Sequence, residues 1–196
     1  MKVIGITGGV GAGKSTVLEL LSDICKCCVI KADDVAKKLM MPGEEGYENV
    51  LDIFGCDILA PDKTIDRTVL ADIIFKNPNK RMVLNSIIHP MTKRAVIDEI
   101  NNHKIAGDVD FLFVEAALLF DDHYDIFMDE TWYINASEDI RRERLVKNRG
   151  YSNEKITGIF NSQLKDEEFK NKCDRIIDNS KDLDYVKAQL EDMLKM

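Results

Sequence analysis

Long apolar runs are missing from this sequence, and none approaches the roughly 20 residues that cross a bilayer. The sequence therefore predicts no transmembrane helix. Its amino end enters a short apolar segment directly, without the successive charged, apolar and small-residue regions of a secretory signal. We expect a cytoplasmic protein that associates with no membrane.

Positive charge is also in short supply. Lys and Arg number 27 against 35 Asp and Glu, which gives a formal net charge of −8. A net negative charge provides no long-range attraction for a nucleic acid or an anionic membrane, so we expect neither partner. Any anionic ligand must be bound by a local group of positive side chains.

Cysteine is sparse, odd in number and unevenly spread, which favours reduced thiols over structural disulfides. The five are Cys25, Cys27, Cys28, Cys56 and Cys173. Residues 25–28 have a C-x-x-C spacing, but no second pair of Cys or His ligands stands nearby to complete a zinc site. Metal or redox use is one interpretation of the cluster. Burial of small apolar side chains is the other, and the sequence favours it.

The length of 196 residues and the 45% hydrophobic content predict one compact unit without linkers or repeats. Segments that predict buried strands cover residues 2–7, 27–30, 111–115, 131–134 and 175–177. Helical periodicity lies between them, and from about 34 to 103 the pattern is almost wholly helical, with Asn77-Pro78 predicting a helix cap followed by proline in the first turn. Strands that alternate with helices predict an α/β fold with a mainly parallel sheet. The helical stretch is then an insertion beside that sheet.

The first predicted strand is followed by the sequence G-G-V-G-A-G-K-S, which occupies Gly8–Ser15 and fits the phosphate-loop pattern G-x-x-x-x-G-K-[ST]. Glycines let the backbone curl so that successive N–H groups point at phosphate oxygens, next to a helix amino terminus. In this pattern Lys14 bridges the β- and γ-phosphates and Ser15 holds Mg²⁺. The alternative is a glycine-rich turn that only joins strand to helix, but such a turn would not need Lys14.

A phosphate loop does not by itself distinguish a metabolite kinase from a nucleotide-dependent switch. Residues 52–55 and 171–174 match the D-x-x-G and N-K-x-D elements of GTPases. The first follows a segment of helical period, and the second follows a polar, helix-like segment where a buried strand would be needed. We interpret both matches as chance.

Two other features suit a kinase. Asp33 follows the second predicted strand and is the candidate base for the acceptor hydroxyl, with a helix cap as the alternative. A helical pair at about 137–163 concentrates positive charge that could form a lid excluding water, with a solvated helix face as the alternative. Its basic residues are Arg141, Arg142, Arg144, Lys147 and Arg149, of which Arg144 is the chosen phosphate ligand.

Taken together, the sequence resembles the dephospho-CoA kinase family over nearly its whole length. The ordered blocks that carry the resemblance are Gly5–Thr16, Ala32-Asp33 with Pro42-Gly43, Asp66-Arg67, Asn85–Pro90, Leu118–Asp121, Arg144-Leu145 with Gln163, and Asp174 with Ile177–Asn179. Only the phosphate loop is widely shared among proteins, so the order of the other blocks gives the resemblance its specificity.

The resemblance implies a P-loop fold in three layers with a five-stranded parallel sheet. The core would span about 1–33, 108–136 and 170–196, the helical CoA-binding insertion about 34–107, and the lid about 137–169. The implied reaction is ATP- and Mg²⁺-dependent phosphorylation of the ribose 3′-hydroxyl of dephospho-CoA, the last step of CoA synthesis. Another nucleotide or metabolite kinase, or a nucleotide-dependent switch, is the alternative. The protein is expected to be a monomer or a weak homo-oligomer.

Site residues follow from the same resemblance. Asp33, Lys14 and Arg144 are the expected catalytic residues, and Asp33, Arg67, His89 and Leu118 the expected acceptor-binding residues. ATP is expected at Gly9, Gly11, Ala12, Gly13, Lys14, Ser15, Thr16, Arg144 and Asn179, with Asn179 beside the adenine. Glu115, at the end of the third strand, is a candidate for binding Mg²⁺ through water. For Arg67 an ion pair with Asp66 is the alternative, and for His89 an ordinary interhelical hydrogen bond.

The sequence departs from the family pattern at a few places. Lys31 stands where the first aspartate of the family's Asp-Ala-Asp segment is usual, which places more weight on Asp33. Ala117 replaces a proline, Ile159 an arginine, and Asn148-Arg149 reverses the usual Arg-Asp order.

Overall fold

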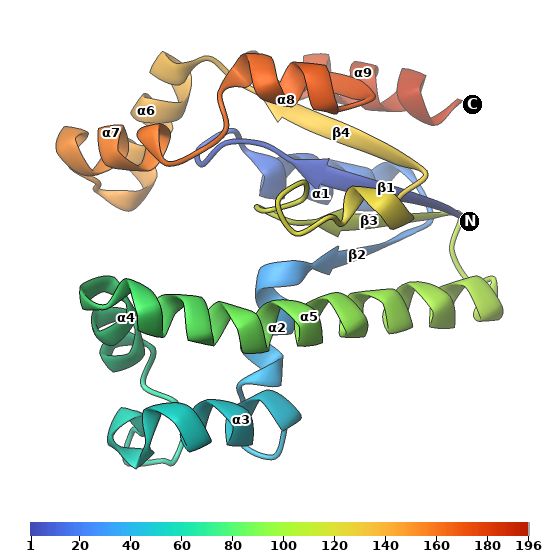
Figure 1. Ribbon diagram of the computed structural model, residues 1–196. Coiled ribbons are helices and arrows are strands. Elements are labelled where there is room, and N and C mark those ends of the chain that lie inside the picture. The colour runs from blue at the N-terminus through green and yellow to red at the C-terminus, as the bar shows by residue number, and fades with distance from the viewer. Residues whose placement is uncertain (196) are drawn as a thin grey trace. The chain divides into compact units, whose positions relative to one another are not determined.

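The computed structural model describes residues 1–195 and divides into two compact units (Figure 1). The first unit consists of Met1–Ile30 together with the chain from His103 onward, and the second is Lys31–Asn102. Helix α5, Pro78–Ala106, carries the chain from the second unit back into the first. Of the helices described in residues 1–195, none is long and apolar enough to cross a membrane.

The first unit contains the predicted five-stranded parallel sheet, with strand order β2-β3-β1-β4-β5. The strands are β1 (Lys2–Thr7), β2 (Cys27–Lys31), β3 (Phe111–Glu115), β4 (Glu130–Asn135) and β5 (Arg175–Asp178). β1 pairs in parallel with β3 on one side and β4 on the other. Strand β1 is therefore central, and the loop that follows it leaves the middle of the sheet.

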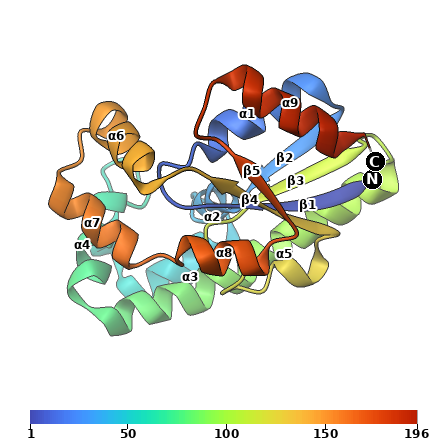
Figure 2. The same ribbon diagram turned by 90° about the horizontal axis from the view of Figure 1, so that it is seen from above.

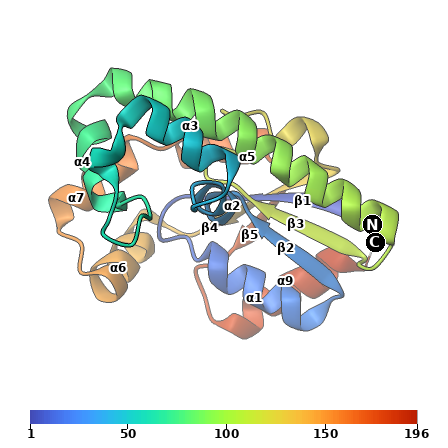
Figure 3. The same cartoon turned by 90° about the horizontal axis from the view of Figure 1, so that it is seen from below.

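Helices cover both faces of this sheet. Helices α1 (Lys14–Ile24) and α9 (Leu183–Leu194) lie side by side on one face (Figures 2 and 3). On the other face, Tyr133 stacks on Phe169 of α8 (Asp166–Lys172) with ring centroids 4.8 Å apart. The face under α1 and α9 buries Ile4, Ile6, Val17, Leu21, Trp132, Ile134, Ile177, Val186 and Leu190. Burial of such side chains contributes about 1.5–3 kcal/mol each, which makes this core the support of the loop after β1.

The second unit is helical, as predicted. It contains α2 (Ala32–Leu39), α3 (Glu45–Phe54), the short 3₁₀ helix η1 (Cys56–Ile58), α4 (Arg67–Lys76) and most of α5. Its core is formed by Tyr47, Val50, Ile58, Leu84 and Ile88, among others. The expected cap at Asn77 is confirmed, because its Oδ1 accepts hydrogen bonds from the N–H groups of Asn79 and Lys80. Pro78 then opens α5, where its missing N–H costs nothing.

The remaining elements belong to the first unit. They are the 3₁₀ helix η2 (Asp125–Phe127) and the predicted pair α6 (Glu138–Arg149) and α7 (Asn153–Asn161), followed by α8. The two GTPase-like matches fall on helices, since Asp52 lies in α3 and Asn171 in α8. Neither follows a strand, which agrees with their interpretation as chance.

Candidate active site

The phosphate loop occupies Gly8–Gly13, between the central strand β1 and α1. Gly11 and Gly13 have φ of 84° and 89°, a backbone conformation that other residues adopt only with strain. Gly13 is also the N-cap of α1. The unpaired N–H groups at the start of this helix and its partial positive charge therefore lie at the loop, which is the arrangement that binds phosphate.

Lys14 holds its ammonium group at the start of the loop. Its Nζ donates a hydrogen bond to Gly8 O at 2.9 Å and lies 3.8 Å from Glu115 Oε1 at the carboxyl end of β3. Only 14% of the Lys14 side chain and 19% of the Glu115 side chain are exposed, so the pair is weakly screened by solvent. Ser15 and Thr16 stand in the same first turn of α1, with Ser15 exposed.

The turn after β5 contacts the other end of the loop. Asn179 is buried, and its Nδ2 donates to Ala12 O at 2.7 Å. Arg144 donates from Nη1 to the same Ala12 O at 3.2 Å and from Nη2 to Asn179 O at 2.8 Å. The structure thus brings Arg144, Asn179 and the phosphate loop together, although they lie far apart in the sequence.

A pocket of about 320 Å³ opens beside Arg144, between α6 and the turn after β5. It is lined by Ile140, Glu143, Arg144, Lys147, Asn148 and Ser180. The guanidinium group offers a flat cationic surface on which an aromatic base could stack. Because Ser180 follows Asn179 directly, this pocket adjoins the position that was expected beside an adenine.

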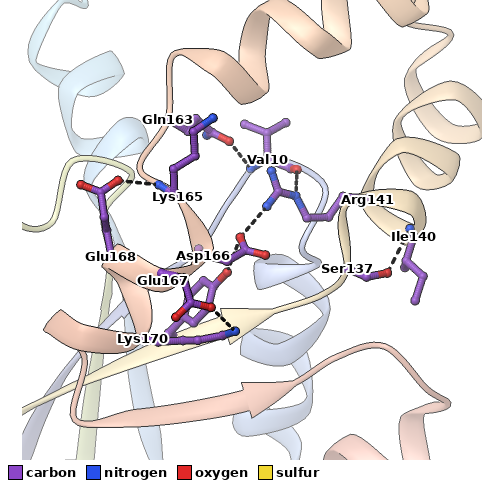
Figure 4. A network of polar contacts seen from close by, with 12 residues as sticks. Val10, Ser137, Ile140, Arg141, Gln163, Lys165, Asp166, Glu167, Glu168 and Lys170 are labelled. Atoms are coloured by element: carbon purple, nitrogen blue, oxygen red, sulfur yellow. Dashed lines mark hydrogen bonds and ion pairs between the residues drawn. The ribbon is translucent and has the colours of Figure 1, made fainter.

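Sequence reasoning missed the contacts of Val10, in the middle of the loop (Figure 4). Its N–H donates to Gln163 Oε1 at 3.1 Å, and its carbonyl oxygen accepts from Arg141 Nε at 3.2 Å. Arg141 also donates from Nη1 to Asp166 Oδ1 at 3.2 Å. The sequence held one signal for Arg141: it lies four residues before the apolar Leu145, and so on the same face of α6.

The second unit contains three of the predicted acceptor-binding residues. Helix α2 begins at Ala32, so Asp33 is an exposed residue of its first turn and is not its N-cap; the cap alternative is wrong. Arg67 opens α4, where Asp66 accepts hydrogen bonds from the N–H groups of Thr68 and Val69. His89 is half-buried in α5. In this unit Arg67 also lines a pocket of about 240 Å³ together with Met40, Met41, Thr64, Ile65 and Leu70.

Leu118 and four of the five cysteines lie in the first unit, away from the loop contacts described above, and Cys56 lies in the second unit. Leu118, in the turn after β3, is 43% exposed. The cysteines are free thiols. Burial raises the pKa of Cys25 to about 12, with the neighbouring Cys27 adding to the shift, and burial likewise raises the pKa of Cys173 to about 12. Both thiols therefore stay protonated at neutral pH, where the protonated form is a poor nucleophile and metal ligand.

Comparisons with known proteins agree on one family. The model of the family described as dephospho-CoA kinase matches residues 2–184. A dephospho-CoA kinase of Oceanobacillus iheyensis is 34% identical over 193 residues, which cover 98% of this chain and 96% of that one. A dephospho-CoA kinase of Carboxydothermus hydrogenoformans is 33% identical over 195 residues, covering 100% of this chain and 94% of the relative.

Three solved structures share the fold of this chain. The protein TT1252 of Thermus thermophilus superposes with a TM-score of 0.81 at 25% identity, covering 98% of this chain and 96% of that one. A dephospho-CoA kinase from Campylobacter jejuni gives a TM-score of 0.71 at 22% identity, covering 100% of this chain and 96% of its own. A shikimate kinase from Bacteroides thetaiotaomicron, at 14% identity and a TM-score of 0.55, covers 100% of this chain and 99% of its own and shares the fold alone.

Proposed function

Because this chain belongs to the dephospho-CoA kinase family, we propose that it transfers the γ-phosphoryl group of ATP to the ribose 3′-hydroxyl of dephospho-CoA, giving CoA and ADP. It is an ATP-dependent kinase, and hence a transferase. The support that carries the proposal is the match of residues 2–184 to the family, with the complete phosphate loop inside it.

The phosphates of ATP bind to the loop in this proposal. Backbone N–H groups of Gly9, Gly11, Ala12 and Gly13 and the start of α1, with Lys14, Ser15 and Thr16, are the assigned contacts. The lysine of a phosphate loop contacts the β- and γ-phosphates. Because Lys14 Nζ donates to Gly8 O, these two phosphates are assigned to the end of the loop that begins at Gly8. Its positive charge offsets the negative charge that phosphoryl transfer spreads over the transferred oxygens.

The adenine occupies the pocket beside Arg144 and the Asn179-Ser180 turn. Asn179 and Arg144 hold the Ala12 carbonyl, so they couple the position of the base to the shape of the loop. The flat face of the Arg144 guanidinium group stacks on the base or lies at its edge. Its N–H donors that are not bonded to Ala12 O or Asn179 O reach toward the phosphates. Arg144 is therefore assigned to both the base and the phosphates of ATP.

Magnesium fits the side chains at the loop. The ion prefers oxygen ligands and usually keeps several waters, and the exposed Ser15 hydroxyl and the Glu115 carboxylate are oxygen donors of that kind. We assign Ser15 as the direct ligand and Glu115 as a partner through water. When bound, Mg²⁺ would neutralise charge on the β- and γ-phosphates.

The acceptor is assigned to Asp33, Arg67, His89 and Leu118. Asp33 is exposed at the start of α2, and as a carboxylate it accepts the proton of the reacting hydroxyl or orients that hydroxyl. Arg67 offers a guanidinium group at the rim of a largely apolar pocket, which suits a substrate with a diphosphate and a long uncharged arm. Because Asp33, Arg67 and His89 belong to the second unit, Lys31–Asn102, this unit is proposed to provide most of the contacts to dephospho-CoA.

We also propose the partners, the oligomeric state and the location of the enzyme. It acts on small molecules rather than on a nucleic acid, as a monomer or weak homo-oligomer, in the cytoplasm. The free thiols of its five cysteines suit a reducing compartment.

The test is an assay of ADP release with ATP and Mg²⁺, in which dephospho-CoA, AMP, CMP, adenosine and no acceptor are compared. We expect release that depends on dephospho-CoA, with CoA identified by mass spectrometry. GTP in place of ATP tests the donor. Turnover with a different acceptor would reject the assigned substrate, and hydrolysis that no acceptor changes would indicate a nucleotide-dependent switch.

A further inference from the structure

Arg141 lies against the phosphate loop, although it comes from α6. The residue is only 6% exposed. A Cβ atom added to Gly9 would lie 2.6 Å from the guanidinium carbon of Arg141, so a side chain at position 9 would displace the guanidinium group. The loop thus has a closely fitted cation beside its first turn, in addition to Lys14.

This contact lies at the reactive end of the loop. The Lys14 ammonium group is bonded to Gly8 O, and the lysine of a phosphate loop reaches the β- and γ-phosphates. Arg141 packs on Gly9, the next residue. Arg144, in contrast, contacts Ala12 at the other end. Arg141 and Arg144 therefore contact opposite ends of the loop.

The guanidinium group of Arg141 is held in one orientation from several sides. Asp166 Oδ1 accepts from Nη1, and the same carboxylate oxygen accepts from the Tyr133 hydroxyl at 2.9 Å. The ring of Phe160 lies under the guanidinium carbon, 4.3 Å from it. Burial and the Asp166 carboxylate raise the pKa of Tyr133, so its hydroxyl remains a donor. A side chain fixed in this way loses little further entropy when it holds a partner.

Val10 is the group that Arg141 holds. Its carbonyl oxygen accepts from Arg141 Nε, while its side chain packs on Leu145, Ile156 and Phe160. In a planar trans peptide the C=O and the following N–H point in opposite directions. The bond to Arg141 therefore turns the N–H of Gly11 away from Arg141.

We propose that Arg141 is a positioning residue for phosphoryl transfer, which fixes the Val10–Gly11 peptide at the γ-phosphate end of the loop and is itself oriented by Asp166. The inference rests on the proposed function, because it assumes that ATP binds on this loop. Since Asp166 balances the charge of Arg141, its contribution is geometric, and small displacements of a reacting group are costly in rate.

The test compares Arg141→Lys with Arg142→Gln. Lysine keeps the positive charge, but it lacks the planar guanidinium group that donates to Val10 O and to Asp166 Oδ1 at the same time. We expect Arg141→Lys to lower kcat for CoA formation by about 10²-fold, with KM for both substrates within about threefold of the wild type. Arg142 is the matched control, because it also lies over Phe160, at 5.4 Å, but pairs with the exposed Glu138. Its substitution should leave kcat within about twofold.

Two further measurements separate positioning from a general structural role. ADP lacks the γ-phosphate, so its affinity, measured by calorimetry, should be unchanged in Arg141→Lys, and circular dichroism should show that the variant is folded at the assay temperature. Asp166→Asn should lower kcat by about tenfold, and Arg141→Gln combined with Asp166→Asn should be no slower than Arg141→Gln alone, since the two side chains act as one unit.

An unchanged kcat in Arg141→Lys would overturn the inference. So would a loss of kcat that is matched by an equal loss of ADP affinity or of folded protein. The wild-type enzyme tests the proposed function separately: if it forms no CoA, the acceptor assignment fails. The same variants are then compared in ATP hydrolysis without acceptor, where the positioning role predicts the same loss.

Discussion

At the scale of single residues, Lys14 and Glu115 show how a charge is kept where it is needed. The ammonium group is largely buried, held by Gly8 O at 2.9 Å and faced by the Glu115 carboxylate at 3.8 Å. An ammonium group in such surroundings interacts strongly with any phosphate that enters. Its position is set before a nucleotide arrives, so little reorganisation is left for the reaction.

The substitution Lys14→Ala should abolish measurable turnover, because it removes the cation at the β- and γ-phosphates. Circular dichroism and thermal melting should show a folded protein, since the core under α1 is untouched. Lys187→Ala, on the exposed surface of α9, is the control and should retain activity. Retained activity in Lys14→Ala would remove the phosphate loop from the mechanism.

The substitution Asp33→Asn should lower kcat by about 10²-fold, the usual scale for a lost general base. Helix α2 begins at Ala32, and asparagine fits its first turn, so stability should change little. The affinity for ATP, measured by calorimetry, should also be kept because Asp33 is assigned to the acceptor. Asp34→Asn, next to it, is the control, as Asp34 pairs with the exposed Lys37. An unchanged kcat in Asp33→Asn would reject the base.

At the scale of secondary-structure elements, Glu130 links three strands of the sheet. From the start of β4 it pairs with Lys2 of β1 at 2.8 Å and with Arg175 of β5 at 3.1 Å, and it accepts from Trp132 Nε1 at 2.9 Å. Burial alone would raise the pKa of Glu130, but the hydrogen bonds from Lys2 and Trp132 and the charges of Lys2 and Arg175 outweigh it. The pKa of Glu130 lies below its ordinary value of 4.5.

A lowered pKa in the folded state means that ionised Glu130 stabilises the fold above pH 4.5, and that this stabilisation disappears as the pH falls through the lower, folded-state pKa. The variant Glu130→Gln should therefore lose about 1–2 kcal/mol in the free energy of unfolding at pH 7. The difference should shrink as the pH falls below 4.5. Urea titrations of both proteins between pH 3 and 7 measure this difference. The control Glu191→Gln breaks only an exposed pair, and a loss of equal size there would contradict the prediction.

The elements also show where sequence reasoning succeeded. The five strands were predicted because each is a short apolar run, and the cap at Asn77 because an asparagine before a proline marks the start of a helix. The start of α2 was predicted one or two residues late. Ala32 is buried and apolar, and the Lys31 backbone turns into the helix without a side-chain cap, so the usual polar marker was absent.

At the scale of the whole molecule, the two compact units are proposed to divide the substrates between them. The first carries the phosphate loop and the pocket beside Arg144. The second carries Arg67 with its own pocket and Asp33. The net charge of −8 does not prevent anion binding, because Lys14 and Arg144 provide positive charge at the loop.

Hydrogen exchange measured by mass spectrometry can test this division. ADP with Mg²⁺ should slow exchange in residues 8–16 and around Asn179, because bound phosphates and base protect those backbone groups. Dephospho-CoA alone should slow exchange within residues 31–102. If dephospho-CoA protects only segments of the first unit, the assignment of the acceptor to the second is wrong. The variant Lys14→Ala with ADP serves as the control for binding at the loop.

The sequence by itself determined the fold class, the phosphate loop and the family, because these depend on local patterns: apolar runs of strand length, a glycine-rich loop with Lys14, and an ordered set of blocks along the chain. Only the tertiary structure decided which basic residue of α6 meets which part of the loop. Arg141 and Arg144 are both arginines of α6, three residues apart. They differ in that the fold places Asp166 and Phe160 around Arg141, and the Asn179 turn beside Arg144. Contacts of that kind join residues separated by many positions, so no local pattern records them.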